Sequence, residues 1–170
     1  MADLAPCERL QPSLLDRLTD DEPDSESESR ERRVLSLRAL RNCVLRDLAW
    51  LFNTTCLLLA ADAPRLPHVA SSVLNYGLPD LSGNSIANLN LSRLERAIRQ
   101  AIWDFEPRLI RSTVSVRALP ADSAGHNKIS FEIEADMWAQ PYPERLYLRT
   151  ELDLEHGSVT LAETGARSLA

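Results

Sequence analysis

The hydrophobic period of this chain changes from about 3.6 residues to 2 near Pro107, and no other feature constrains the fold as strongly. Before that point, apolar residues share one face of a predicted helix that begins near residues 90–92: Leu91, Leu94, Ile98, Ala101, Ile102 and Phe105. Pro107 lacks an N–H and disfavours the α region at Glu106, so the helix is expected to end there. Residues 109–117 are β-branched and alternating, which predicts a strand. Glu106 and Arg108 therefore flank a rigid bend between helix and strand.

Two further helices are predicted nearer the N-terminus. An apolar stripe predicts a first helix that Ser29 caps and that stops near Asn53: Val34, Leu37, Leu40, Val44, Leu48 and Leu51. A short helix is expected over residues 68–75, with Gly77 marking its end. Residues 78–84 are predicted to form a loop, because they combine proline, aspartate, glycine and asparagine.

The last third of the chain alternates between apolar and polar residues. Residues 129–137 and 146–154 are each predicted to form a strand with one buried and one solvated face. Alternation in consecutive strands favours an antiparallel sheet. Gly157 then turns the chain into a short final strand at residues 159–161, a plausible sheet edge. The predicted fold class is α+β, with N-terminal helices packed on one face of a small, mainly antiparallel sheet.

The chain is expected to form one domain between two tails. Residues 1–30 are predicted to be a flexible N-terminal tail with an acidic, Ser-rich linker, residues 31–165 a single α+β domain, and residues 166–170 a C-terminal tail. The N-terminal tail carries a cluster of leucines. We expect Leu14 and Leu15 to dock on a partner, because a free tail gains nothing from exposed leucines.

The composition argues against several classes of function. A net charge of −6 disfavours binding to nucleic acid or to anionic membranes. No apolar run approaches the ~20 residues of a membrane span, and we expect no signal peptide. The 3 cysteines lack metal-site spacing, so no metal or cofactor is expected and a reducing cytoplasm fits. The histidines form neither a triad nor a zinc pattern and are expected in solvated loops: His68, His126 and His156.

The strongest enzyme hypothesis is a glycosidase that uses Glu106 as acid and Asp104 or Asp80 as second carboxylate. Residues two positions apart on a helix diverge, so Asp104 does not face Glu106. Arg108 beside Glu106 favours the charged carboxylate, whereas a general acid has to carry a proton. A salt-bridged corner or an outward-facing recognition pair is the better interpretation.

Charged side chains also follow the polar face of the predicted sheet: Glu132, Glu134, Asp136, Arg149 and Glu151. An ordinary solvated face with cross-strand ion pairs is one interpretation. A sheet that receives an extra strand from another chain at its edge is the other. Periodicity does not distinguish them.

Three motifs together resemble a known family. They are Trp-Leu-Phe-Asn-Thr-Thr at residues 50–55, Ser-Val-Leu-Asn-Tyr-Gly-Leu-Pro-Asp-Leu-Ser-Gly at residues 72–83, and Phe-Glu-Pro-Arg-Leu at residues 105–109. The chain resembles the TssE family, baseplate components of the bacterial type VI secretion system, within the lysozyme-like wedge family of contractile-tail phages. The similarity covers roughly residues 10–165. At residues 51–55 the family usually has Leu-Leu-Asn-Thr-Arg, so this chain departs at a helix end.

The resemblance implies a structural, non-enzymatic subunit that links the baseplate wedge core to the contractile sheath and helps to initiate sheath polymerisation. It implies that Glu106, Pro107 and Arg108 contact the central helical bundle of the wedge, and that the sheet is a template for strand exchange with sheath protein. The implied partners are other baseplate wedge proteins and sheath subunits, in a cytoplasmic, membrane-docked assembly. Arg108→Ala is then expected to abolish assembly in a folded protein. The alternatives are a lysozyme-like peptidoglycan hydrolase and a baseplate protein of a contractile phage.

Overall fold

Each of the two long helices of the domain begins with a polar N-cap residue. The computed structural model describes residues 13–19, 36–58, 63–80, 89–119, 128–139 and 143–164. In it, helix α2 spans Leu37–Phe52 and helix α4 spans Leu91–Phe105. The Ser36 hydroxyl accepts a hydrogen bond from the Ala39 N–H at 3.1 Å, and Asn90 caps α4 in the same way at 3.0 Å. Both bounds predicted for α4 are confirmed. The cap predicted for the first helix was wrong, because Ser36 stands where its hydroxyl can bond the first turn, and Ser29 lies outside the described residues.

The strands form a sheet in chain order. Its order is β1-β2-β3-β4, and all neighbouring pairs are antiparallel: β1 (Ser115–Ala118), β2 (Lys128–Met137), β3 (Glu144–Asp153) and β4 (Ser158–Glu163). The predicted alternation is confirmed in β2 and β3, whose inward side chains are buried: Ile129, Phe131, Ile133, Ala135, Met137, Leu146, Leu148, Thr150 and Leu152. Gly157 turns the chain between β3 and β4 with φ of 63°. β1 and β4 are the two edges of the sheet.

The strand predicted over residues 109–117 is broken in the structure. Leu109 forms only an isolated bridge to Met137, residues Arg111–Thr113 form the 3-10 helix η5, and β1 begins at Ser115. The interruption coincides with a side-chain contact to β2, since the Thr113 hydroxyl accepts the Asp136 N–H at 2.8 Å and takes the place of a backbone partner.

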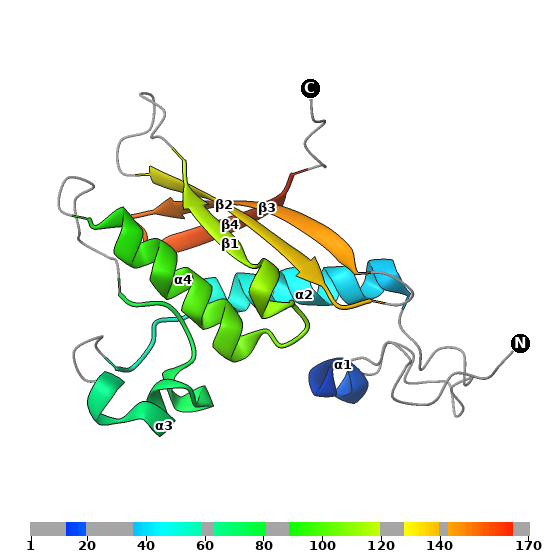
Figure 1. Cartoon of the computed structure of the whole chain (residues 1–170), viewed down its shortest axis with the longest axis horizontal. Coiled ribbons are helices and arrows are strands. Elements are labelled where there is room, and N and C mark those ends of the chain that lie inside the picture. Colours follow the sequence, from blue (N-terminus) through cyan, green and yellow to red (C-terminus); the bar gives the residue numbers. More distant parts are fainter. Residues whose placement is uncertain are drawn as a thin grey trace, which may run out of the picture.

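The two long helices cover one face of the sheet, as Figure 1 shows, with α4 beneath β1 and α2 beneath β4. Their apolar stripes meet the inward face of the strands in one core, to which α2 contributes Leu40, Val44, Leu48, Leu51 and Phe52 and α4 contributes Leu94, Ile98, Ala101 and Ile102. The predicted fold class, α+β with helices packed on one face of an antiparallel sheet, is confirmed. None of the described helices has the length and apolar content needed to cross a membrane.

The segment after α2 begins with the 3-10 helix η2 (Ala63–Arg65), and two short helices follow it where one was predicted. Helix α3 spans Pro67–Ala70 and the 3-10 helix η3 spans Val73–Asn75. They are separate because Ser72 takes an extended conformation and its hydroxyl accepts the Leu74 N–H at 3.3 Å, which starts a new turn. The predicted loop is described over residues 78–80, which form no helix, and its remainder lies outside the described residues.

Gly77 joins this segment to the end of α2. The Leu78 N–H donates to the Thr54 carbonyl at 2.8 Å, and the Cys56 N–H donates to the Leu78 carbonyl at 2.9 Å. Gly77 has φ of 126°, and a Cβ atom there would lie 2.3 Å from the Thr54 carbonyl oxygen. Two of the sequence motifs, at residues 50–55 and 72–83, therefore meet as paired backbone that only glycine permits at this position.

Part of the predicted N-terminal tail is a helix. Helix α1 spans Leu14–Leu18, and the Ser13 hydroxyl caps it by accepting the Asp16 N–H at 3.3 Å. The domain boundaries predicted at residues 30 and 165 lie outside the described residues and stay predictions.

Candidate functional site

The corner at residues 106–108 is fixed by its own backbone. The Glu106 N–H completes the last turn of α4 by donating to the Ile102 carbonyl at 2.9 Å. Pro107 stops the helix and is exposed, and the Leu109 N–H returns to the Glu106 carbonyl at 3.2 Å. Leu109 is buried in the core and holds the far side of the turn. The corner thus has one backbone geometry between helix and sheet.

Glu106 is a buried carboxylate, and Arg108 donates hydrogen bonds to both of its oxygens. The residue is 3% exposed, and its two carboxylate oxygens accept from Nε of Arg108 at 2.6 Å and from Nη2 at 2.5 Å. The Arg108 backbone N–H adds a third contact to Oε1 at 3.2 Å. This two-point pairing of a guanidinium with a carboxylate is stronger than a neutral hydrogen bond and fixes the orientation of both groups.

Arg108 extends the pairing to helix α2, in which no partner for it was predicted. Its Nη2 donates to Oδ2 of Asp47 at 2.6 Å, and Oδ1 of Asp47 accepts from Nε of Arg46 at 2.9 Å and from Nη2 at 2.8 Å. Nη1 of Arg46 in turn donates to Asp16 of α1 at 2.6 Å. We call these five residues of alternating charge the ion chain: Glu106, Arg108, Asp47, Arg46 and Asp16. It ties the corner, α2 and α1 together.

The ion chain changes the protonation of its members. Burial alone would lower the pKa of Arg108, but hydrogen bonds and charge from Glu106 and Asp47 outweigh burial and raise it. Burial would raise the pKa of Asp16, but hydrogen bonds from Arg46, Ser13 and Cys43 outweigh burial and hold it at about 2. Burial, then the charges of Asp47 and Glu106, raises the pKa of the Tyr76 phenol, which donates to the Asp47 carbonyl at 3.3 Å.

Of the two charged corner residues, only Arg108 reaches the surface. Its side chain is 22% exposed, against 2% for Glu106. Its Nη1 is nevertheless buried, and within the part of the chain that the structure describes this nitrogen has no hydrogen-bond partner. Glu106 therefore cannot meet a partner's arginine and instead orients Arg108. The role of Glu106, Pro107 and Arg108 as a contact site stays a prediction.

The leucines of α1 face away from the domain. Ser13 and Asp16 form the polar side of the helix, and Asp16 binds α2 through Arg46. Leu14 is 71% and Leu15 46% exposed, and Leu18 is exposed as well. A short helix that meets its own domain through a carboxylate leaves its apolar side for another surface, so the predicted docking of Leu14 and Leu15 remains a prediction with a defined geometry.

The residues of the glycosidase hypothesis do not form a cleft. Both carboxylate oxygens of Asp104 accept from Nε2 of Gln100 at 3.0 Å, and Asp80 lies on an exposed loop. His68 and His156 are exposed, as predicted, but His68 lies in helix α3 and not in a loop, and His126 lies outside the described residues. Among the described residues no group of histidine, cysteine, aspartate and glutamate side chains is arranged to hold a metal ion.

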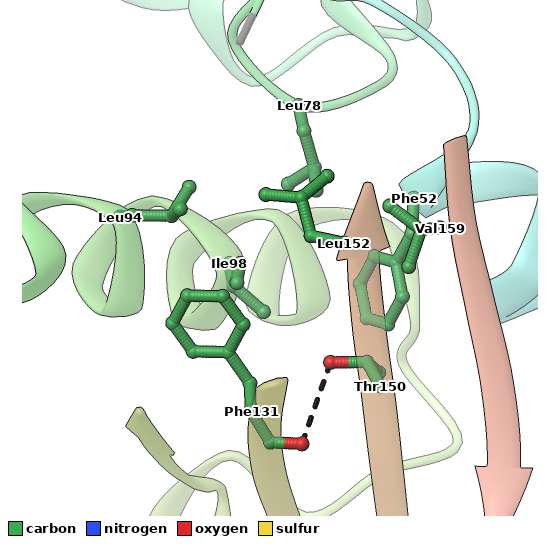
Figure 2. A pocket seen from close by; sticks show the side chains of 8 residues that line it. All are labelled: Phe52, Leu78, Leu94, Ile98, Phe131, Thr150, Leu152 and Val159. Atoms are coloured by element: carbon green, nitrogen blue, oxygen red, sulfur yellow. Dashed lines mark hydrogen bonds between the residues drawn. The ribbon is translucent and has the colours of Figure 1, made fainter. Parts of the chain in front are cut away.

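A small hollow lies between the helices and the sheet, and Figure 2 shows its lining. It has about 10 Å³ of open space, which is at most the size of one water position. Thr150 is its one polar residue, and its hydroxyl donates to the Phe131 carbonyl at 3.4 Å; the other lining residues are apolar: Phe52, Leu78, Leu94, Ile98, Phe131, Leu152 and Val159. A space of this size and polarity is a packing defect and does not bind a sugar.

Comparison with known proteins gives one family match. A sequence model described as baseplate wedge protein gp25 matches residues 38–142. The match includes α2, α4, the corner and β2, and it ends before β3 and β4. No curated protein and no solved structure matches the chain.

Proposed function

Since the chain belongs to the baseplate wedge protein gp25 family, we propose that it is the wedge subunit of a type VI secretion baseplate. A structural role in a phage-tail-like baseplate, assembled with other baseplate proteins, follows from the family. The finer proposal is that the subunit links the wedge core to the contractile sheath and helps to initiate sheath polymerisation. The three motifs that resemble the TssE family support the secretion system over a phage virion.

The ion chain is the observation that carries the proposal. A rigid corner that holds one arginine by two internal carboxylates suits a fixed protein contact, since the side chain loses little further freedom on binding. Arg108 then offers the exposed part of its side chain to a carbonyl or carboxylate of the wedge core, while Glu106 and Asp47 keep the guanidinium in place. Pro107 fixes the angle at which the arginine is presented.

Two further surfaces support a place between partners. The exposed leucines of α1 offer an apolar contact for a second wedge protein. An edge of the sheet offers backbone groups to sheath subunits, in which case main-chain hydrogen bonds supply the affinity. With a net charge of −6, the protein is proposed to work in the cytoplasm and to reach the membrane only through the assembly, without binding nucleic acid or inserting into the bilayer.

The test is co-purification of the tagged protein from its own cells, with bound chains identified by mass spectrometry. Arg108→Lys is the decisive variant, because lysine keeps a positive charge beside Glu106 but loses the fork that reaches Asp47 and a partner together. Arg96→Lys on the exposed side of α4 is the matched control. The melting temperature of each variant shows whether it is folded.

We expect wild type and Arg96→Lys to recover wedge and sheath subunits, and folded Arg108→Lys to lose the wedge subunits. Normal recovery by Arg108→Lys would contradict the role of the corner. Recovery of virion tail proteins would identify a phage baseplate instead. If wild type recovers no baseplate protein, the assembly role fails and an assay of peptidoglycan turnover becomes the next experiment.

A further inference from the structure

The free edge of β4 leaves three residues with outward backbone groups. The Thr164 N–H donates inward to the Tyr147 carbonyl at 2.9 Å, whereas the Val159 N–H is not used by β3. Because this direction alternates along a strand, Val159, Leu161 and Glu163 all direct N–H and C=O groups away from the sheet. A partner strand would pair with these groups.

Asn53, the C-cap residue of α2, already occupies the first of these positions. Its Oδ1 accepts the Val159 N–H at 2.9 Å, and its Nδ2 donates to the Val159 carbonyl at 2.9 Å. A side-chain amide that bonds both groups of one residue reproduces the two contacts of a neighbouring strand. In the described residues, the outward backbone groups of Leu161 and Glu163 have no such partner.

The β1 edge is closed more firmly. β1 has 4 residues, and α4 packs against it. The Ala118 N–H donates to a carboxylate oxygen of Glu95 on α4 at 2.7 Å, and a hydrogen bond to a charged acceptor is stronger than one to an amide. Val116 is the one residue of this strand that keeps both outward groups unpaired, and Ala118 keeps only its carbonyl, which is too little for a stable strand pairing.

We propose that β4 is the edge that accepts a strand from a partner protein, and that Asn53 is a displaceable plug that closes this edge until the partner arrives. The inference rests on the proposed function, because that function supplies a partner chain with an extended segment. The incoming strand pairs first with Leu161 and Glu163 and then replaces the Asn53 amide at Val159. The outward backbone groups of these three residues fix its register.

The Asn53 amide can leave without unfolding α2. The backbone N–H of Asn53 donates to the Ala49 and Trp50 carbonyls, both at 3.2 Å, and the Thr54 hydroxyl donates to the Trp50 carbonyl at 2.8 Å. The Asn53 side chain adds one bond to this helix end, from Nδ2 to the Ala49 carbonyl at 2.8 Å, and the backbone N–H and Thr54 contacts remain when that bond is lost. Asn53 is also exposed, so water can satisfy its released amide. A side chain that closed the edge permanently would be buried or charged, and Glu95 on the β1 edge is charged.

The partner segment is defined by the side chains around the open edge. Thr160 and Ala162 are small and exposed on the outer sheet face, while Val159 and Leu161 lie half-buried towards the helices. An extended segment with alternate apolar residues would continue the inward face, and small or polar residues would lie on the outer face. The only charge on the edge, Glu163, is paired with Arg41 of α2.

The plug predicts that removing the amide strengthens strand addition. We would compare wild type with Asn53→Ala, and use Thr54→Ala as matched control because Thr54 bonds the same helix end without touching β4. The readouts are sheath subunits recovered with the tagged full-length protein, hydrogen exchange of residues 158–164, and self-association of the purified protein by analytical ultracentrifugation. Asn53→Ala removes the two hydrogen bonds to Val159 and the Nδ2 bond to the Ala49 carbonyl. Losing the two bonds to Val159 is expected to tighten strand binding roughly tenfold.

Support requires that folded Asn53→Ala recovers more sheath protein than wild type, with slower exchange at Leu161 and Glu163 in the complex. Equal or lower recovery by Asn53→Ala, while wild type still binds sheath, would overturn the plug and leave the proposed function standing. If no sheath protein binds either form, the sheath role fails, and self-association of the purified protein then tests the plug. Asn53→Ala dimers protected at residues 158–164 would then support the plug, and a monomer would refute it.

Discussion

The buried negative charge of Glu106 is compensated by the guanidinium of Arg108. Removing the guanidinium in Arg108→Ala would leave the carboxylate uncompensated at 3% exposure, so we expect the free energy of unfolding to fall by about 3–5 kcal/mol. Urea unfolding measures the loss, and Arg96→Ala on the exposed side of α4 should stay within about 0.5 kcal/mol of wild type. A loss as small as that of the control would show that the corner is held by its backbone alone. The expected cost revises the sequence-based expectation of an intact Arg108→Ala protein.

Gly77 is required by a close approach of two backbones. In Gly77→Ala the new Cβ would lie 2.3 Å from the Thr54 carbonyl oxygen, at a φ of 126° that other residues avoid. We expect a loss of at least about 2 kcal/mol in unfolding free energy. Gly157→Ala is the comparison, because its φ of 63° is strained but no contact opposes the added atom, and it should cost only about 1 kcal/mol. Equal losses for the two variants would contradict the proposed steric cause.

At the residue scale, the sequence predicted the pair within the corner but not its wider network. Glu106 and Arg108 are two positions apart across a proline, so their meeting is a local matter. Asp47 is 61 positions from Arg108, and Asp16 is 30 from Arg46. No pattern in the neighbouring sequence predicts such pairs, because they depend on how α1, α2 and α4 pack together.

Helix α1 is expected to leave α2 when Asp16 loses its charge. The folded-state pKa of Asp16 is about 2, below the 3.8 of an unfolded carboxyl, so its contribution is fully present above about pH 4 and is lost as the pH falls through about 2. Asp16→Asn should release α1 at every pH. Amide chemical shifts of residues 14–18 measure docking, and Glu151→Gln on the exposed sheet face is the control. Shifts of α1 that do not change with pH in wild type would count against this role of the ion chain.

At the element scale, regular periods were predicted well and interruptions poorly. The ends of α4, the alternation in β2 and β3 and the turn at Gly157 all follow from local residue chemistry. The break between Leu109 and Ser115 depends on Thr113 meeting Asp136 of another strand, and the two short helices at residues 67–75 depend on one serine hydroxyl. Such side-chain contacts interrupt a helix or strand although the hydrophobic period of the sequence continues through the interruption.

The whole molecule is expected to lack glycosidase activity. Glu106 lies under Arg108, Asp104 is turned to Gln100, and the apolar hollow in Figure 2 has space for one water at most. Purified protein should therefore release no reducing sugar from peptidoglycan above the background of Glu106→Gln, with lysozyme as the positive control. Release that depends on Glu106 would refute a purely structural role.

For the whole molecule, the sequence predicted the layers but not the closure of the edges. Consecutive alternating strands led to an antiparallel sheet, and amphipathic stripes placed the helices on one face. That β4 is an edge could be inferred from its short length. That Asn53 and Glu95 each bond an edge strand could not, since these contacts join a helix to a strand 106 and 23 positions away in the sequence.

The chain-order sheet has a consequence for folding kinetics. Every strand pairs with its neighbour in sequence, so the sheet closes through short loops, whereas Asn53 and Val159 are 106 positions apart. Docking of α2 on β4 should therefore come after the main barrier, on a sheet that has already formed. Asn53→Ala should accordingly accelerate unfolding and leave the refolding rate unchanged in stopped-flow experiments. The contact that guards the edge of the native protein would then be among the last to form each time the chain folds.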